Sequence, residues 1–209
     1  MSFSLWLTFF AASWAISFSP GPGAISAMAS GLKYGFRRGY WTTLGLECGI
    51  LCQLAIVALG LGALLATSEL AFAMVKWVGV AYLIYLGAKQ FRTDAMPVAV
   101  EARPTGNVEI REQIMRGYLV NMTNPKGTMF LLAVVPQFLD LAQPLPLQYV
   151  IIGATLCFTD LVAMGCYTSL SSRILRLMHK PGHIRWLNRG FGALFILAGT
   201  ILASLGRRA

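Results

Sequence analysis

Ser19-Pro20-Gly21-Pro22-Gly23 lies in an apolar stretch that contains no charged residue between Met1 and Leu32. A stretch of this length and composition is typical of a membrane-spanning helix, which needs roughly 20 apolar residues. The two prolines remove backbone donors, and the two glycines permit conformations that a helix forbids. In hydrocarbon, neighbouring helices or a polar cavity must satisfy the freed backbone groups. The motif therefore predicts a broken transmembrane helix and a functional site beside it.

The composition is typical of an integral membrane protein. Of the 209 residues, 56% are hydrophobic and 12% are charged, and the mean hydropathy is +0.65. Soluble domains carry about 25% charged residues, so we expect no separate soluble domain. The net charge of +9 would suit a nucleic-acid surface, but the basic residues fall between apolar runs. We therefore interpret them as topogenic charge beside a lipid bilayer and expect no nucleic-acid partner.

Six apolar segments are long enough to span a bilayer. They are Phe3–Leu32, Tyr40–Thr67, Leu70–Gly87, Gly117–Leu139, Leu145–Leu170 and Trp186–Leu205. The first is not a secretory signal, because it lacks a basic start and is too long. Lys and Arg occur in the first, third and fifth gaps, which the positive-inside rule places in the cytoplasm, with both termini outside. Arg207 and Arg208 argue against an external C-terminus, but the basic residues of the three gaps outnumber them.

A second broken segment lies half a chain after the first. Asn121-Met122-Thr123-Asn124-Pro125-Lys126-Gly127 interrupts the fourth span, and the helix that follows each break carries an acid, Glu47 or Asp160. Because each half contains three spans, the second half must enter the membrane from the opposite side. The pattern predicts an all-α membrane protein whose six transmembrane helices form an inverted 3+3 repeat, with the first and fourth helices broken at proline motifs.

The predicted repeat divides the chain into three parts. Residues 1–92 form the first three-helix repeat, 93–112 a cytoplasmic linker and 113–209 the second repeat. In secondary transporters of this architecture, the site lies where the two broken helices face each other. At 1.5 Å per residue, both breaks and both acids fall roughly 10–20 Å from the cytoplasmic ends of their segments. We therefore expect all four features in one layer near the midplane.

The expected site combines both signs of charge. Half-helix N-termini after Gly23 and after Gly127 present free N–H groups, which together with Lys126 suit a carboxylate. Either acid suits an ammonium group, and either could exchange a proton. A zwitterionic amino acid meets both demands. The predicted substrate-binding or coupling residues are Pro20, Gly21, Pro22, Gly23, Glu47, Asn121, Asn124, Pro125, Lys126 and Asp160.

Simpler structural roles are open for some of these residues. Lys126 could form a buried ion pair with either acid that only joins helices. Asn121, Asn124 and Thr128, spaced i, i+3 and i+7, are expected along one helical face. Asn121 and Thr128 could instead serve only as interhelical hydrogen-bond groups. Gly45-x3-Gly49 predicts a close helix contact, either within one chain or between the protomers of a homo-oligomer.

The chain carries no motif for catalysis, a metal or a cofactor. It has no HExxH, Gly-x-Ser-x-Gly or glycine-rich nucleotide loop, so we expect neither an enzyme nor a bound cofactor or metal. One rival function is a transmembrane thiol–disulfide electron carrier using Cys48, Cys52 and Cys157. Such a carrier needs a reactive pair beside a helix break, and no cysteine adjoins either proline motif. A passive accessory subunit is a further rival.

The ordered combination of motifs resembles the LysE-type amino-acid exporters, and among them the homoserine/threonine efflux branch. The resemblance covers nearly the whole chain and is carried by the Ser19–Gly23 motif, the glycine series Gly35, Gly39, Gly45 and Gly49, the run Ala81–Gly87, and Asn124-Pro125-Lys126. It implies six helices in a bacterial cytoplasmic membrane. It also implies efflux of amino acids or close derivatives in exchange for protons.

One departure from the family pattern narrows the substrate. The basic-amino-acid exporters of the family typically carry Asn-Pro-His, with an Asp four residues after the His, whereas this chain has Lys126 and Phe130 at those positions. A site with one acid fewer and one base more should not favour lysine or arginine. The resemblance therefore implies proton-coupled export of small neutral compounds such as homoserine, threonine, leucine or homoserine lactone, with basic amino-acid export as the alternative.

Overall fold

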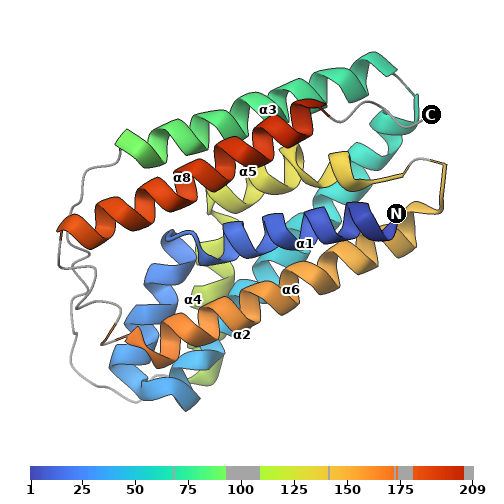
Figure 1. The fold of residues 1–209 in the computed structure, drawn as a ribbon. Helices are drawn as coiled ribbons and strands as arrows, with labels where there is room; N and C mark the ends of the chain where they lie inside the picture. Colours follow the sequence, from blue (N-terminus) through green and yellow to red (C-terminus); the bar gives the residue numbers. More distant parts are fainter. Residues whose placement is uncertain (68, 93–108, 141, 172, 174–180, 205–209) are drawn as a thin grey trace.

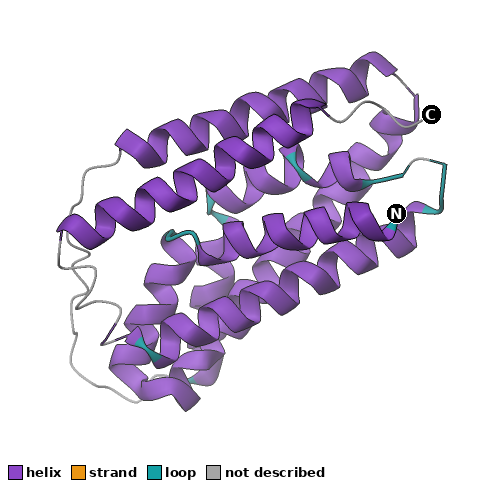
Figure 2. Cartoon of the chain, viewed as in Figure 1, coloured by secondary structure: helices purple, strands orange, loops and turns teal. Residues whose placement is uncertain are grey.

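The computed structural model is a bundle of α-helices, and it contains no strand in the residues that it describes (Figure 2). These are residues 1–67, 69–92, 109–140, 142–171, 173 and 181–204. The predicted linker lies outside them as far as residue 108, as do the two C-terminal arginines. The prediction of an all-α fold is confirmed.

The helices follow the predicted order with different boundaries (Figure 1). They are α1 (Phe3–Phe18), α2 (Pro22–Thr67), α3 (Glu69–Arg92), α4 (Ile110–Met122), α5 (Pro125–Ala133), the short 3-10 helix η1 (Val135–Phe138), α6 (Leu145–Ser169) and α8 (Pro181–Ser204). The first and fourth predicted spans are each divided in two. Helix α4 begins inside the predicted linker, with Glu112 in its first turn, where an acid suits the positive end of the helix dipole.

The first proline motif separates α1 from α2, as predicted. Helix α1 ends at Phe18, and Ser19 adopts an extended backbone (φ −70°, ψ 120°). Helix α2 begins at Pro22, because a fixed φ and a missing N–H suit the first helical position. Neither glycine of the motif has a positive φ. The break therefore forms without a left-handed glycine.

The second proline motif separates α4 from α5 in the same way. Helix α4 ends at Met122, and Asn124 caps α5, its Oδ1 accepting a hydrogen bond of 3.1 Å from the Lys126 N–H. This break confirms the second prediction. It also shows that the expected common face of Asn121, Asn124 and Thr128 is wrong, because the helix ends before it reaches Asn124.

Helix α2 reverses direction at Gly35, where the first cytoplasmic gap was predicted. Gly35 has φ 71° and ψ 175°, a left-handed conformation that glycine adopts without steric strain. The hydroxyl oxygens of Ser30 and Thr42 lie 2.8 Å apart across the turn, so the two arms of α2 run side by side. The gap that carries Lys33 is therefore a sharp turn at a single glycine.

Close helix contacts at glycine hold α2 against its neighbours. Helix α2 packs most extensively against α4 and then α6, while α3 pairs with α8. A Cβ atom at Gly45 would overlap the Ile114 carbonyl oxygen, and one at Gly117 would overlap the Thr42 carbonyl oxygen. A Cβ at Gly49 would lie 2.8 Å from the Asn121 Cβ. The predicted contact at Gly45-x3-Gly49 is confirmed, and it lies within one chain, between α2 and α4.

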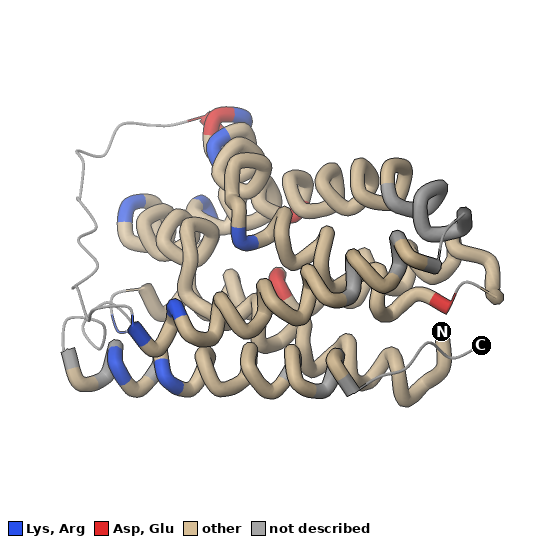
Figure 3. The backbone as a smooth tube through the Cα atoms, turned by 90° about the horizontal axis from the view of Figure 1, so that it is seen from above, with Lys and Arg blue, Asp and Glu red and all other residues tan. Residues whose placement is uncertain are grey.

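By length and composition alone, two of the described helices are long and apolar enough to cross a membrane, α6 and residues Pro22–Gly60 of α2, although α2 reverses at Gly35 within that stretch. Helix α1 is apolar but has only 16 residues, because the proline motif ends it. Figure 3 shows most Lys and Arg of the described helices gathered at one end of the bundle. The start of α1 and the end of α8 lie at the opposite end, as alternating basic gaps require.

A side chain added at the α2–α4 contact should destabilise the fold. We expect Gly45→Ala or Gly117→Ala to lower the free energy of unfolding by about 1–3 kcal/mol, because the new methyl group meets backbone atoms that cannot move aside. The matched control is Gly60→Ala on the same helix, where a Cβ meets nothing within 4 Å. Thermal unfolding in detergent measures the difference. Equal melting temperatures for the three variants would contradict this account of the contact.

Candidate functional site

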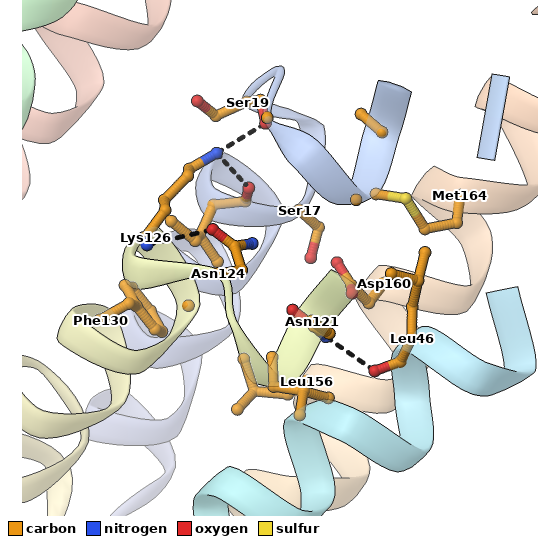
Figure 4. A pocket seen from close by; sticks show the side chains of 16 residues that line it. Ser17, Ser19, Leu46, Asn121, Asn124, Lys126, Phe130, Leu156, Asp160 and Met164 are labelled. Atoms are coloured by element: carbon orange, nitrogen blue, oxygen red, sulfur yellow. Dashed lines mark hydrogen bonds between the residues drawn. The ribbon is translucent and has the colours of Figure 1, made fainter. Parts of the chain in front are cut away.

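A pocket lies where the two helix breaks meet, enclosed by α1, α2, α4, α5 and α6 (Figure 4). Its lining consists of Ile16, Ser17, Ser19, Gly21, Gly23, Ala24, Leu46, Ile50, Asn121, Asn124, Lys126, Gly127, Phe130, Leu156, Asp160 and Met164. Segments from both halves of the chain therefore contribute to one cavity. Its lining combines apolar side chains with polar groups from the breaks.

The pocket contains six of the ten residues predicted from the sequence. Gly21, Gly23, Asn121, Asn124, Lys126 and Asp160 line it. The three prolines do not line it, but they set the helix ends that face it. Glu47 does not line it either. Although its neighbour Leu46 contacts the cavity, the Glu47 side chain is buried against α6 beside Cys157.

Lys126 binds the free end of α1. Its ammonium group donates hydrogen bonds to the backbone carbonyl oxygens of Ser19, at 2.6 Å, and Ile16, at 3.4 Å (Figure 4). These carbonyls have lost their helical partners because α1 stops at Phe18. The ammonium therefore pairs with backbone carbonyls, and the predicted ion pair with an acid does not form in this structure.

The Lys126 side chain passes directly beside Gly21 on its way to α1. A Cβ atom at position 21 would lie 3.5 Å from the Lys126 Cδ and 3.6 Å from its Nζ, which is ordinary van der Waals contact. On another side, the Tyr167 hydroxyl donates to the Phe18 carbonyl oxygen at 2.6 Å. Two side chains from the second half of the protein thus satisfy the end of α1.

Gln53 of α2 performs the same task at the second break. Its side-chain amide nitrogen lies 3.0 Å from the Asn121 carbonyl oxygen, 3.2 Å from that of Met122 and 2.7 Å from the Thr128 hydroxyl. The side chain is buried, with 5% of its surface exposed. Neither Gln53 nor Tyr167 was predicted from the sequence as part of the site. Gln53 could have been found as a glutamine within an apolar span. Tyr167 has no feature in the sequence that distinguishes it from other aromatic residues of the spans.

The interhelical roles proposed for Asn121 and Thr128 are confirmed. The Asn121 amide donates to the Leu46 carbonyl oxygen at 2.7 Å, which ties α4 to α2 (Figure 4). Thr128 accepts from Gln53 and donates to the Asn124 carbonyl oxygen at 3.2 Å. Asn121 also lines the pocket, so its structural bond holds it at the edge of the cavity.

Two helix N-termini open into the pocket. At the start of α2, the N–H groups of Gly23 and Ala24 have no hydrogen-bond acceptor among the described residues, and at the start of α5 the same holds for Gly127. Free N–H groups and the positive end of the helix dipole favour an anion at such a position. The helices begin slightly earlier than predicted, at Pro22 and Pro125, and both ends face the same cavity.

Asp160 of α6 supplies the negative charge of the pocket. The Ser17 hydroxyl of α1 points toward its carboxylate (Figure 4). Lys126, which belongs to α5, lies on the opposite side of the same view. Asp160 and Lys126 therefore attract each other across the cavity without direct contact. This arrangement can hold a molecule with one positive and one negative group, the cation at Asp160 and the anion at the helix N-termini.

The cysteines do not contribute to this cavity. All four are free, and none is among the residues that line the pocket. No group of three or more metal-binding side chains occurs in the part of the chain that the structure describes. The chemistry available at the site is thus the binding of charged and polar groups by carboxylate, ammonium, amide and backbone N–H.

The sequence matches known proteins over nearly its full length. The profile of the LysE type translocator family matches residues 14–206. A homoserine/homoserine lactone efflux protein from Salmonella typhimurium (strain LT2) is 38% identical over 205 residues, which cover 98% of each chain. An uncharacterised membrane protein from Vibrio cholerae is 34% identical over the same length and coverage. A leucine efflux protein from Enterobacter sp. (strain 638) is 26% identical over 189 residues, 89% of each chain. No solved structure matches the chain.

Removing the Lys126 ammonium should loosen the first break. We expect Lys126→Met to lower the free energy of unfolding by about 1.5–3 kcal/mol, the range for hydrogen bonds to charged groups, because two carbonyls of α1 lose their donor. Lys33→Met is the matched control, since Lys33 contacts the Tyr34 ring near the Gly35 turn, away from the pocket. Thermal unfolding in detergent tests this, and an unchanged melting temperature for Lys126→Met would contradict it.

Proposed function

The chain belongs to the LysE-type translocator family, and we propose that it exports small neutral amino acids or their derivatives from the cytoplasm. The substrate class is that of homoserine, threonine, leucine and homoserine lactone. Relatives named as homoserine/homoserine lactone and leucine efflux proteins support this class. Transport by alternating access at the two helix breaks accounts for the activity without an enzymatic step.

The observation that carries the proposal is the pocket shared by the two breaks. A neutral amino acid has an ammonium group and a carboxylate on adjacent atoms. Asp160 suits the first, and the free N–H groups at the starts of α2 and α5 suit the second. The Lys126 ammonium adds positive charge on the carboxylate side. The two opposite charges of the substrate therefore each find a complementary group.

Phe130 argues for a neutral side chain on the substrate. In the basic-amino-acid exporters of the family, from whose pattern this chain departs, the equivalent position typically carries an acid. Here the phenyl ring is 2% exposed and lines the pocket. A second ammonium or guanidinium group would lose its hydration beside this ring without gaining a carboxylate partner. The site thus favours homoserine-like compounds over lysine and arginine.

The proposed architecture is an inverted 3+3 repeat. Residues 1–92 and 113–209 would form its halves, joined by the linker 93–112. Two observations support it. Each half has a broken first helix, and the free carbonyls at each break bind a side chain from the other half. Lys126 binds at the first break and Gln53 at the second. The third helices of the two halves, α3 and α8, pack against each other.

We place the protein in the bacterial cytoplasmic membrane as a multi-pass protein, with the basic end of the bundle in the cytoplasm and both termini outside. The gathering of Lys and Arg at one end supports this orientation. Export against a gradient needs an energy source, and the resemblance to proton-driven exporters supports exchange of substrate for protons. Buried acids near the pocket are suited to carry those protons.

Transport in inverted membrane vesicles tests the function. We expect an acidic lumen to drive uptake of radiolabelled homoserine, threonine or leucine at least ten-fold above vesicles without the protein, and uptake to collapse when the proton gradient is dissipated. Lysine and arginine should not accumulate. Uptake of none of the panel would refute the proposal, and preferential uptake of lysine or arginine would support the alternative of a basic-amino-acid exporter.

Asp160→Asn should weaken this transport strongly. The substitution keeps the size of the side chain but removes the charge that the substrate ammonium needs, and a loss of about 2 kcal/mol corresponds to a roughly thirty-fold lower apparent affinity. The control is Asp140→Asn, because Asp140 lies outside the pocket and its carboxylate accepts a hydrogen bond from the Ala142 N–H, which an amide oxygen can also accept. Initial rates across homoserine concentrations measure the effect. Equal kinetics for both variants would exclude Asp160 from the site.

A further inference from the structure

Glu47 is a buried acid that the substrate pocket does not use. It lies on α2, with 6% of its surface exposed, and it is absent from the pocket lining although Leu46 belongs to it. Neither carboxyl oxygen makes a hydrogen bond of normal geometry to the described residues. The thiol of Cys157 on α6 is the polar group beside it. Most buried polar groups in proteins are paired, so this one requires an explanation.

No cation compensates Glu47 in the described part of the chain. The interior cation Lys126 is engaged by the carbonyls of α1. On α4, the helix packed most extensively against α2, the charged residues Arg111, Glu112 and Arg116 are exposed. From α6 it faces Cys157 and, farther off, the negative charge of Asp160. An ionised carboxylate in such surroundings would be strongly unfavourable, so Glu47 holds a proton in this conformation.

Two further polar side chains share the face of α2 on which Glu47 lies. Tyr40, Thr43 and Glu47 are spaced i, i+3 and i+7, which places them on one face of α2. The Tyr40 hydroxyl donates to the Leu161 carbonyl oxygen of α6 at 3.0 Å, and Tyr40 is partly exposed. The Thr43 hydroxyl is buried and has no hydrogen-bond partner among the described residues. The face thus carries one partly exposed hydroxyl, at Tyr40, and one buried unpaired hydroxyl, at Thr43, on the side of the helix that holds the acid.

We propose that Glu47 carries the exchanged proton, while Asp160 binds the substrate ammonium. The inference rests on the proposed function and assigns different roles to the two acids. A substrate ammonium at Asp160 adds positive charge near Glu47, which favours the ionised carboxylate and releases its proton toward the cytoplasm. After the substrate has left on the outer side, the Glu47 carboxylate takes up one proton from that side. One substrate molecule then leaves for each proton that enters.

Proteoliposomes separate coupling from binding. The purified protein is tested with radiolabelled homoserine, and with leucine as a second probe. One assay measures uptake driven by an acidic lumen. The other measures exchange into substrate-loaded vesicles without a gradient. We expect Glu47→Gln to lose gradient-driven uptake by at least ten-fold. Its exchange should stay within about two-fold of wild type. Glu47→Asp, which keeps a titratable group, should retain gradient-driven uptake with a shifted pH profile.

The matched control is Glu112→Gln, which removes an exposed carboxyl group outside the site and should leave both assays unchanged. Gradient-driven uptake by a folded Glu47→Gln at the wild-type rate would overturn the proposal. Loss of exchange together with uptake, at an unchanged melting temperature, would overturn it too, because Glu47 would then bind substrate. If wild type itself shows no homoserine or leucine transport, the proposed function fails instead.

A measurement on the wild-type protein covers the case in which Glu47→Gln does not fold. In weakly buffered detergent solution, homoserine binding should release about one proton per protein at neutral pH, and Glu112→Gln should release the same amount. Substrate binding without proton release would overturn the assignment of Glu47, while leaving Asp160 as the ammonium site.

Discussion

The backbone groups freed at the two helix breaks are the constraint on which the rest of this structure depends. In an apolar bundle, a carbonyl without a partner is strongly unfavourable, and each break leaves several. Lys126 takes the carbonyls of Ser19 and Ile16, and Gln53 takes those of Asn121 and Met122. Each half therefore depends on a side chain of the other, and the pocket exists because the two breaks are held face to face.

The same constraint explains why the site carries its charges. A helix that stops and restarts presents free carbonyls at one end and free N–H groups at the next. The carbonyls accept hydrogen bonds from Lys126, while the N–H groups of Gly23 and Gly127 have no partner among the described residues and line the cavity. Asp160 on α6 balances this excess of positive potential. A zwitterion is therefore the ligand whose charges match the groups already present.

Glycine residues allow the helices to pack closely enough to bring the two breaks together. Helix α2 reverses at Gly35 and then runs against α4 so closely that Gly45 and Gly117 meet backbone atoms. This contact brings Gln53 to the end of α4 and Leu46 to Asn121. It also leaves Glu47 between α2 and α6, outside the cavity but beside its wall. Helix packing thus places Asp160 in the wall of the cavity and buries Glu47 outside it.

The sequence by itself determined the class of fold, the two breaks and the acids near them, because proline, glycine and buried charge act locally and leave a readable pattern. It placed Lys126 at the second break and Asp160 on the next span at a similar depth, but it could not say what they touch. It also put Asn121, Asn124 and Thr128 on one helical face, which the end of α4 at Met122 rules out. Only the tertiary structure decided that Lys126 binds backbone carbonyls, that Gln53 and Tyr167 complete the breaks, and that Glu47 faces away from the pocket. These partners lie many residues apart in sequence, and the directions of their side chains follow from how the helices cross, which no local pattern encodes.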